Sequence, residues 1–305
     1  MTAAVAAVAL AIAVAAAPQQ RFRVGVDAVR VDVLVTDGNR PVGGLTADDF
    51  ELRDSGVLQR IDALDLGSVP LNVMLALDSS ESVWGEPLVH LKEAASAVVG
   101  LLTPNDRGAV LTFSGAVQLK TSWTSDRGEL NAAVASAKAT GATSLHDAAY
   151  AALTLRDDQP GRALVLIFSD GDDTASWLSG QSVIEIARRN DAVVYAVALR
   201  PPGFPTPGYR VDFRSGVQPP IPVVTAPALM EPFLNALAEE TGGKYIDARK
   251  SDRLRETFVA IVTEFRTRYV LSYTPRGVDA GGWHAIDVRL KNKKGKVTAR
   301  RGYTR

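Results

Sequence analysis

The sequence predicts an α/β protein with a doubly wound, mostly parallel six-stranded sheet and a smaller β-sandwich-like module built from both chain ends. In the middle of the chain, short apolar runs alternate with stretches of helical period, which is typical of a parallel sheet covered by helices. At both ends, apolar and polar residues alternate with a period of two, which is typical of half-buried strands.

Six short apolar runs are the expected central strands, at 72–77, 109–113, 117–121, 163–169, 193–199 and 244–247. Apolar residues recur every three or four positions over 88–102 and 254–265, which predicts two helices that pack on the sheet. Only residues 114–116 separate the second and third strands, whereas a parallel crossover needs about a dozen residues. These two strands are therefore predicted to form an antiparallel hairpin.

The two ends are expected to pair with each other. Valine occupies every second position from 29 to 35, and apolar residues alternate again over 269–273 and 286–290. Each end is too small to bury a sheet alone, so we predict one module from both. The expected division is a signal peptide at 1–20, a β segment at 21–68, the α/β domain at 69–267 and a second β segment at 268–305.

The first residues are typical of a secretory leader. Residues 3–17 form an apolar run without a charge, shorter than the ~20 residues that a membrane-spanning helix needs. The run suits the hydrophobic part of a signal peptide, although a basic segment before it is missing. Export is the preferred interpretation, and a buried alanine-rich helix is the alternative.

Composition limits the classes of partner and metal site. The chain of 305 residues has 34 basic and 34 acidic residues, so no overall field attracts nucleic acid or an anionic membrane. The absence of cysteine excludes disulfides and thiolate metal sites, and three histidines disfavour a His-rich centre. Any bound metal is expected to be held by oxygen. The proline-rich stretch 201–227 follows a predicted strand and is expected to be a loop at the rim of a site.

Oxygen-bearing residues follow two of the central strands. Asp78, Ser80 and Ser82 come directly after the first strand, and Asp170 follows the run 163–169. In an open α/β sheet, ligands bind beyond the carboxyl ends of the strands, so Asp78 and Asp170 are expected at one edge. Thr143 lies in a turn of the same domain. Several hydroxyls with two carboxylates suit a hard cation such as Mg²⁺, and few anionic ligands leave such an ion electrophilic toward a partner's carboxylate.

At these residues the chain resembles the von Willebrand factor type A (VWA) domain, whose metal-ion-dependent adhesion site (MIDAS) has the pattern Asp-x-Ser-x-Ser, then a separate Thr and a separate Asp. The resemblance covers roughly residues 70–266 and implies a Rossmann-like sheet with one antiparallel strand. It implies that the hydroxyls of Ser80, Ser82 and Thr143 bind the metal. It also implies that Asp78 and Asp170 bind it directly or through water. Mg²⁺ is the implied cofactor, with Mn²⁺ or Ca²⁺ as alternatives.

The flanks, at 31–37, 44–50, 241–243, 269–275 and 301–303, are similar to exported bacterial proteins called VWFA-related. The expected function is a non-enzymatic adhesion or protein-binding module, secreted or in the periplasm or cell envelope. Its partner would be a protein that offers an Asp or Glu carboxylate, with no nucleic acid and no membrane span after removal of the leader. Two alternatives stay open: a metal-dependent hydrolase, for which no base or catalytic motif is evident, and a structural envelope protein with a closed metal site.

Some of these residues also have simpler interpretations. One of the residues Asp78, Ser80 and Ser82 would cap a helix beginning near Trp84, although capping accounts for only one of them. For Asp172 and Asp173, a solvated acidic loop is preferred over a second ion site. For His146, a satisfied histidine at a helix start is preferred over a general base.

The C-terminal tail is basic. After Asp287 it contains no acid, and its basic residues are Arg289, Lys291, Lys293, Lys294, Lys296, Arg300, Arg301 and Arg305. Such a run attracts phosphate polymers or anionic head groups in some proteins. The preferred interpretation is that these charges form the outward faces of edge strands and protect them from aggregation.

Overall fold

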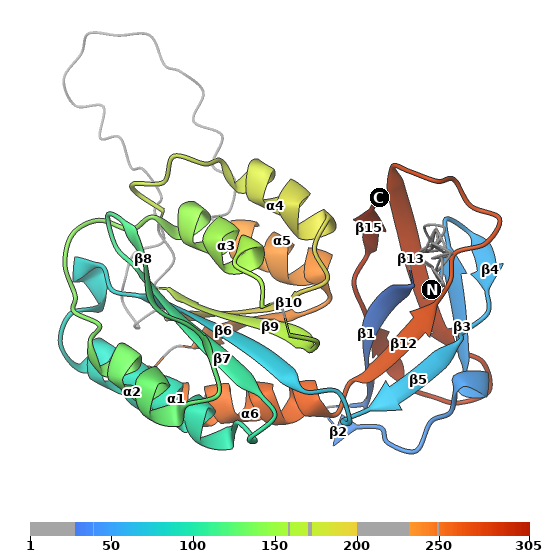
Figure 1. The fold of residues 1–305 in the computed structure, drawn as a ribbon, viewed down its shortest axis with the longest axis horizontal. Helices are drawn as coiled ribbons and strands as arrows, with labels where there is room; N and C mark the ends of the chain where they lie inside the picture. Colours follow the sequence, from blue (N-terminus) through green and yellow to red (C-terminus); the bar gives the residue numbers. More distant parts are fainter. Residues whose placement is uncertain (1–27, 39, 158, 170–172, 200–231, 249) are drawn as a thin grey trace, which may run out of the picture.

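The computed structural model describes residues 28–38, 40–157, 159–169, 173–199, 232–248 and 250–305. The expected leader and the proline-rich stretch 201–227 lie outside these residues. In Figure 1, a six-stranded sheet with helices on both faces lies on the left, and two smaller antiparallel sheets lie on the right. In the described part of the chain, no helix has the length and apolar character needed to cross a membrane.

The six-stranded sheet contains all six predicted strands. They are β6 (Leu71–Asp78), β7 (Arg107–Phe113), β8 (Val117–Thr124), β9 (Arg162–Ser169), β10 (Val193–Leu199) and β11 (Lys244–Ala248). Their order is β11-β10-β9-β6-β7-β8, and the pairs are parallel except for β7 with β8. The predicted hairpin is thus confirmed, and its second strand forms one edge of the sheet.

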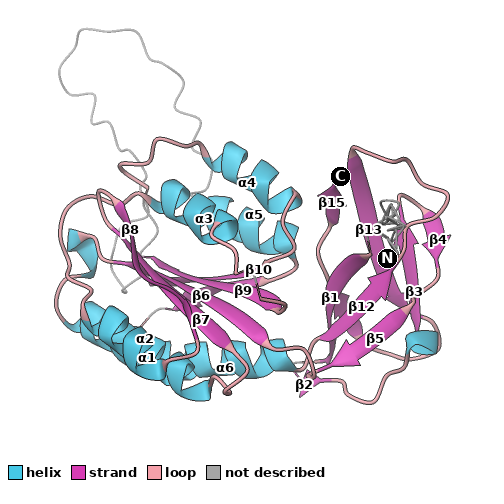
Figure 2. Cartoon of the chain, in the orientation of Figure 1, coloured by secondary structure: helices cyan, strands magenta, loops and turns pink. Residues whose placement is uncertain are grey.

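Helices cover both faces of this sheet (Figure 2). One face carries α1 (Glu86–Leu101), α2 (Arg127–Ala135) and α6 (Leu254–Arg266), and the other carries α3 (Leu145–Thr154), α4 (Gly180–Arg188) and α5 (Pro232–Thr241). The described residues also contain three short 3₁₀ helices, η1 (Ala47–Asp49), η2 (Glu81–Val83) and η3 (Ser251–Arg253). Both helices predicted from apolar stripes, α1 and α6, are confirmed.

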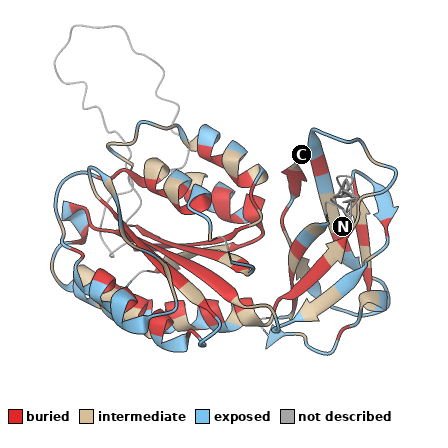
Figure 3. Ribbon diagram, in the orientation of Figure 1, coloured by how far each residue is buried: buried red, intermediate tan, exposed pale blue. Residues whose placement is uncertain are grey.

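Strand β6 lies inside the six-stranded sheet, between β9 and β7, and is buried along all of its length (Figure 3). Its side chains alternate between two cores. Leu71, Val73, Leu75 and Leu77 pack with the face covered by α1, α2 and α6. Met74 and Ala76 pack with the face covered by α3, α4 and α5. An apolar strand without polar alternation is what a central parallel strand requires, because helices cover both of its faces.

The two chain ends form two antiparallel sheets that share one core. The five-stranded sheet contains β1 (Val29–Asp37), β2 (Arg40–Pro41), β5 (Ala63–Leu66), β12 (Tyr269–Tyr273) and β14 (Lys296–Thr298). The four-stranded sheet contains β3 (Phe50–Asp54), β4 (Val57–Gln59), β13 (Trp283–Leu290) and β15 (Gly302–Thr304). Val31 and Tyr269 from the first sheet pack in one cluster with Phe50 and Val288 from the second. The predicted pairing of the two ends is therefore confirmed.

A buried carboxylate joins these two sheets. Asp54 of β3 has no exposed surface, and its Oδ2 accepts hydrogen bonds from the hydroxyls of Tyr273 at 2.8 Å and Tyr303 at 2.9 Å. Its Oδ1 lies 2.9 Å from Nδ1 of His284. Burial, together with this carboxylate, raises the pKa of Tyr303 to about 12, so the phenol stays protonated and remains a donor. No pattern in the sequence singles out His284.

A buried ion pair joins the α/β region to the β sandwich. Arg162, at the start of β9, donates from Nε to Asp32 of β1 at 2.8 Å and from an Nη to the carbonyl of Phe265 at 3.0 Å. The side chains of Arg162 and Asp32 are only 2% and 12% exposed. Because both charges are largely removed from water, each depends on the other for compensation.

A substitution at Gly243 tests the connection into β11. A Cβ at this residue would lie 1.8 Å from the carbonyl oxygen of Val194, so the backbone would have to move. We expect Gly243→Ala to lower the free energy of unfolding by about 2 kcal/mol or more. Gly100 is the control, because it lies in α1 with nothing within 4 Å of its Cβ position. Gly100→Ala should stabilise by about 0.5–1 kcal/mol. Urea unfolding measures both, and equal effects would contradict the packing described here.

A double-mutant cycle tests the buried ion pair. Arg162→Met leaves Asp32 buried without its partner and should lower the free energy of unfolding by about 3 kcal/mol. Adding Asp32→Asn to Arg162→Met should cost little more, because the uncompensated charge is then gone. The exposed pair of Arg289 and Asp287 is the control, and Arg289→Met should have a far smaller effect. Independent, additive effects of the two changes at Arg162 and Asp32 would rule out the coupling.

Candidate metal centre

Asp78 is the last residue of β6 and is held from two sides. Its side chain is fully buried. Oδ1 accepts a hydrogen bond from the backbone N–H of Ser80 at 2.8 Å, and Oδ2 accepts one from the hydroxyl of Ser169 at 2.8 Å. Ser169 is the last residue of β9, the strand next to β6. The carboxylate is therefore fixed at the carboxyl edge of the sheet, as the sequence predicts.

The hydroxyls of Ser80 and Ser82 face each other. Their Oγ atoms lie 2.8 Å apart, with Ser80 buried and Ser82 exposed. Ser80 is the N-cap residue of η2, but its side chain makes no capping hydrogen bond. The helix α1 begins only at Glu86, after Gly85, whose φ is 88°. The capping interpretation of these serines is therefore wrong, because neither hydroxyl is used for it.

The loop that carries Thr143 lies against the 78–82 loop. The N–H of Thr140 donates to the carbonyl of Ser79 at 2.8 Å, and the N–H of Glu81 donates to the carbonyl of Gly141 at 3.0 Å. Thr143 is only 5% exposed. On its other side, its N–H donates to Oγ1 of Thr174 at 2.9 Å. The structure thus brings the loops of four predicted ligands, Asp78, Ser80, Ser82 and Thr143, to one place.

Asp170 lies outside the described residues, so its position stays a prediction. Its preceding residue, Ser169, touches Asp78 as described above.

The oxygens present fit a hard cation. Two neighbouring ligands of an octahedral Mg²⁺ at ~2.0–2.1 Å are ~2.9 Å apart, close to the distance between the hydroxyls of Ser80 and Ser82. Within the described ranges, no three His, Cys, Asp or Glu side chains gather in a group that could hold a metal ion. The described donors at this edge are hydroxyls beside a buried carboxylate, a donor set that suits Mg²⁺ better than softer metals.

Asp173 and His146 have structural partners. Oδ1 of Asp173 accepts hydrogen bonds from the N–H groups of Leu145 at 2.8 Å and His146 at 3.2 Å, so this carboxylate stabilises the start of α3. The preference for a solvated loop was wrong for Asp173, because its side chain is only 19% exposed; Asp172 lies outside the described residues. The Nδ1 of His146 lies 3.1 Å from the carbonyl of Leu178, which fits the simpler interpretation of this residue.

Two exposed tryptophans near this edge were missed by sequence reasoning. Trp84 directly follows η2 and is 74% exposed, and Trp177 is 96% exposed. The carboxylate of Asp147 accepts the N–H groups of Trp177 at 3.0 Å and Leu178 at 2.9 Å, which fixes the backbone at this position. A hollow of about 380 Å³ beside Trp177 is lined by Val117, Ser144, Asp147, Tyr150 and Leu178 among others. The sequence feature that could have indicated these two residues is that both tryptophans follow oxygen-bearing loops.

Comparison with known proteins agrees with this geometry. A search of curated proteins found no match. Among solved structures, a VWA protein from Catenulispora acidiphila has a TM-score of 0.53 and 12% identity, and the match covers 89% of this chain and 75% of that one. Proximal thread matrix protein 1 from the mussel byssus, solved with a zinc-occupied MIDAS motif, has a TM-score of 0.51 and 14% identity over 70% of this chain and 49% of that one. At such identities these likenesses show the fold alone.

The family assignment comes from the sequence match to the von Willebrand factor type A domain over residues 72–256, which is more than half of the chain. The matched range contains the six-stranded sheet from the second residue of β6 through β11, and with it the loops described above. The chain belongs to the von Willebrand factor type A domain family.

Proposed function

We propose that this protein is a metal-dependent adhesion module that binds a carboxylate of a partner protein. The proposed ligands of a Mg²⁺ ion are Asp78, Ser80, Ser82, Thr143 and Asp170. The observation that carries the proposal is the pair of hydroxyls of Ser80 and Ser82, 2.8 Å apart and not used for capping, beside the buried carboxylate of Asp78. A divalent cation bound there supplies Lewis acidity toward an incoming Asp or Glu side chain.

The protein's own groups keep this site weakly anionic. Both oxygens of Asp78 already accept hydrogen bonds, from Ser80 and Ser169, which spreads its negative charge. The other described ligands are neutral hydroxyls. A site with few anionic ligands retains affinity for a further carboxylate, whereas a fully carboxylate-lined site would not.

The surroundings favour binding over catalysis. Asp147, Asp173 and His146, the titratable residues of the α3 start, are each engaged with backbone groups of the neighbouring loops. These contacts give the three residues a structural role around the start of α3. Trp84 and Trp177, by contrast, are exposed aromatic side chains at the same edge, and tryptophan is enriched among residues that dominate binding energies at interfaces. We propose that the partner's carboxylate is flanked by apolar residues that contact these rings.

We also propose that the protein works outside the cytoplasm, which rests on the leader-like segment 3–17. Zinc should be compared with Mg²⁺ and Mn²⁺ in binding experiments, because the mussel protein of the same fold holds zinc in its MIDAS motif.

Metal binding can be tested with two matched serine substitutions. Ser80→Ala removes a proposed ligand and should weaken Mn²⁺ or Mg²⁺ binding at least tenfold, measured by isothermal titration calorimetry. Ser79→Ala is the control, because the Ser79 hydroxyl donates to the carbonyl of Phe113 and is no proposed ligand. Circular dichroism should show that both variants are folded. Equal metal affinity of the two variants would contradict the site.

Partner recognition can be tested with a peptide library. Each peptide that contains Asp or Glu is compared with the same peptide in which Asn or Gln replaces the acid. Peptides with Asp or Glu should bind in Mg²⁺, and binding should disappear with a chelator or with Asn or Gln in place of the acid. Trp177→Ala should weaken peptide binding about tenfold while metal affinity stays the same. Leu58→Ala, an exposed apolar residue on β4, is the control. Acid-independent peptide binding that survives the chelator would exclude the proposed mechanism.

A further inference from the structure

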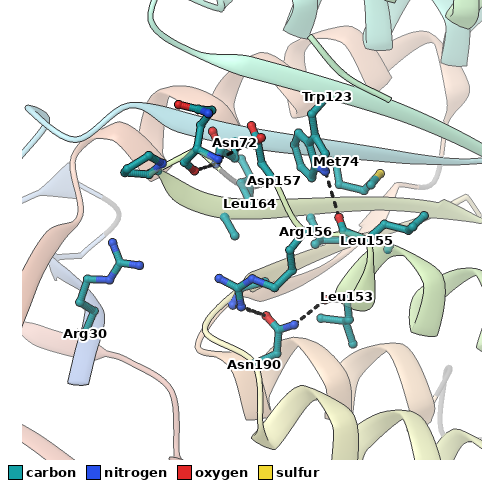
Figure 4. Close-up of a pocket in the computed structure, with 17 residues that line it drawn as sticks. Arg30, Asn72, Met74, Trp123, Leu153, Leu155, Arg156, Asp157, Leu164 and Asn190 are labelled. Carbon is teal, nitrogen blue, oxygen red and sulfur yellow. Dashed lines mark hydrogen bonds between the residues drawn. The ribbon is translucent and has the colours of Figure 1, made fainter. Parts of the chain in front are cut away.

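A second polar hollow lies at the opposite end of the sheet, where the central strands begin. Two adjoining hollows of about 310 and 300 Å³ share Arg30, Arg156 and Asn190 in their linings. Figure 4 shows Arg30 of β1 on one side, and Arg156 and Asn190 of the α/β region on the other. The floor of the larger hollow includes residues at or near the first half of β6 and β9, such as Asn72 and Ala163. This place is therefore remote in the fold from Asp78, which ends β6.

The smaller hollow carries an excess of positive charge. Its lining contains four arginines, Arg30, Arg156, Arg189 and Arg300, and one carboxylate, Asp191. Asp191 pairs with Arg156 at 2.6 Å and with Arg30 at 3.3 Å. The single carboxylate is thus shared by two of the arginines, and the lining retains a surplus of positive charge in a chain whose overall net charge is zero.

Arg300 is the unusual member of this group. It is only 8% exposed, although the sequence analysis placed it on the outward face of an edge strand, and that expectation was wrong. Its Nε donates to the carbonyl of Gly302 at 2.6 Å and one Nη donates to the carbonyl of Arg188 at 3.1 Å. No described carboxylate lies within ion-pair distance of it, unlike the equally buried Arg162. Burial lowers the pKa of Arg300, and the charges of Asp191 and Glu240 oppose this effect only in part.

We propose that the hollow lined by Arg189 and Arg300 is a binding site for a small multivalent oxyanion, either phosphate or a short di- or tricarboxylate. The guanidinium of Arg300 supplies a buried positive charge, and the exposed Arg189 lies at the rim. Arginine presents planar pairs of N–H donors that match the oxygens of such anions. Arg30 and Arg156 add positive potential from opposite sides of the junction.

The position of this site gives the anion a structural consequence. Arg189 belongs to the α/β region, directly after α4, whereas Arg300 lies two residues before β15 of the sandwich. The ion pairs of Arg162 with Asp32 and of Arg30 with Asp191 already connect the two parts of the protein, as does the bond from Arg300 to the carbonyl of Arg188. An anion between Arg189 and Arg300 would add a further connection to these. The site is independent of the proposed metal centre, because no residue is shared between them.

Calorimetric titration of the full chain with inorganic phosphate and, separately, with malonate tests the proposal. The protein is first stripped of divalent cations, so that neither anion binds through a metal, and sodium chloride at equal ionic strength serves as the reference. Saturable binding of phosphate, of malonate or of both supports the site, and the stronger of the two identifies the class of ligand. Absence of saturable binding by both anions overturns the proposal.

Substitutions assign the binding to this hollow. Arg300→Gln and Arg189→Gln should each weaken anion binding about tenfold or more, since each removes a charged donor. Arg189 is exposed, so its variant gives a result even if Arg300→Gln does not fold. The control is Arg289→Gln, an exposed arginine of β13 that does not line the hollow. Anion affinity that is unchanged in Arg189→Gln, or lowered equally in Arg289→Gln, contradicts the assignment.

Discussion

The structure depends on the burial of β6 between two layers of helices and between two parallel neighbours. A strand in this position has no freedom to shift along the sheet, because a change of one residue would exchange the two cores that its side chains fill. The residue at its end is therefore fixed as firmly as the strand itself. That residue is Asp78, and the loops from β7, α3 and β9 assemble around it by backbone hydrogen bonds.

Backbone groups rather than side chains hold the loops of the site together, which explains why hydroxyl groups are available there. Backbone N–H and carbonyl groups hold the 78–82 and 140–144 loops together, so the side chains of Ser80 and Ser82 need not do so. The acidic residues nearby are used differently: Asp173 stabilises the start of α3, and Asp147 fixes the backbone before Trp177. Aspartate thus stabilises the backbone at Asp173 and Asp147, whereas at Asp78 it is a proposed metal ligand.

Local patterns in the sequence were sufficient for the central sheet and for the loop after β6. Apolar runs predicted six strands, and the short connection after Phe113 predicted the hairpin, because both depend on neighbouring residues alone. The roles of Asp173 and of Asp54 with His284 were not predictable in this way, since their partners lie far away in the sequence. Arg300 was misassigned for a related reason: it sits in a basic, alternating tail, and only the tertiary packing shows that it is buried.

The placement of β1 has a consequence for how the chain comes together. In the five-stranded sheet β1 lies between β14 and β12, both of which follow the entire α/β region in the sequence. During synthesis β1 therefore has only the short β2 as a partner, at its end, while the α/β region, whose contacts are closer in sequence, completes its own sheet. The sandwich can form only when the last segment has been made, so it forms late in folding. A chain truncated after α6 would leave β1 without its main partners and prone to strand pairing between molecules.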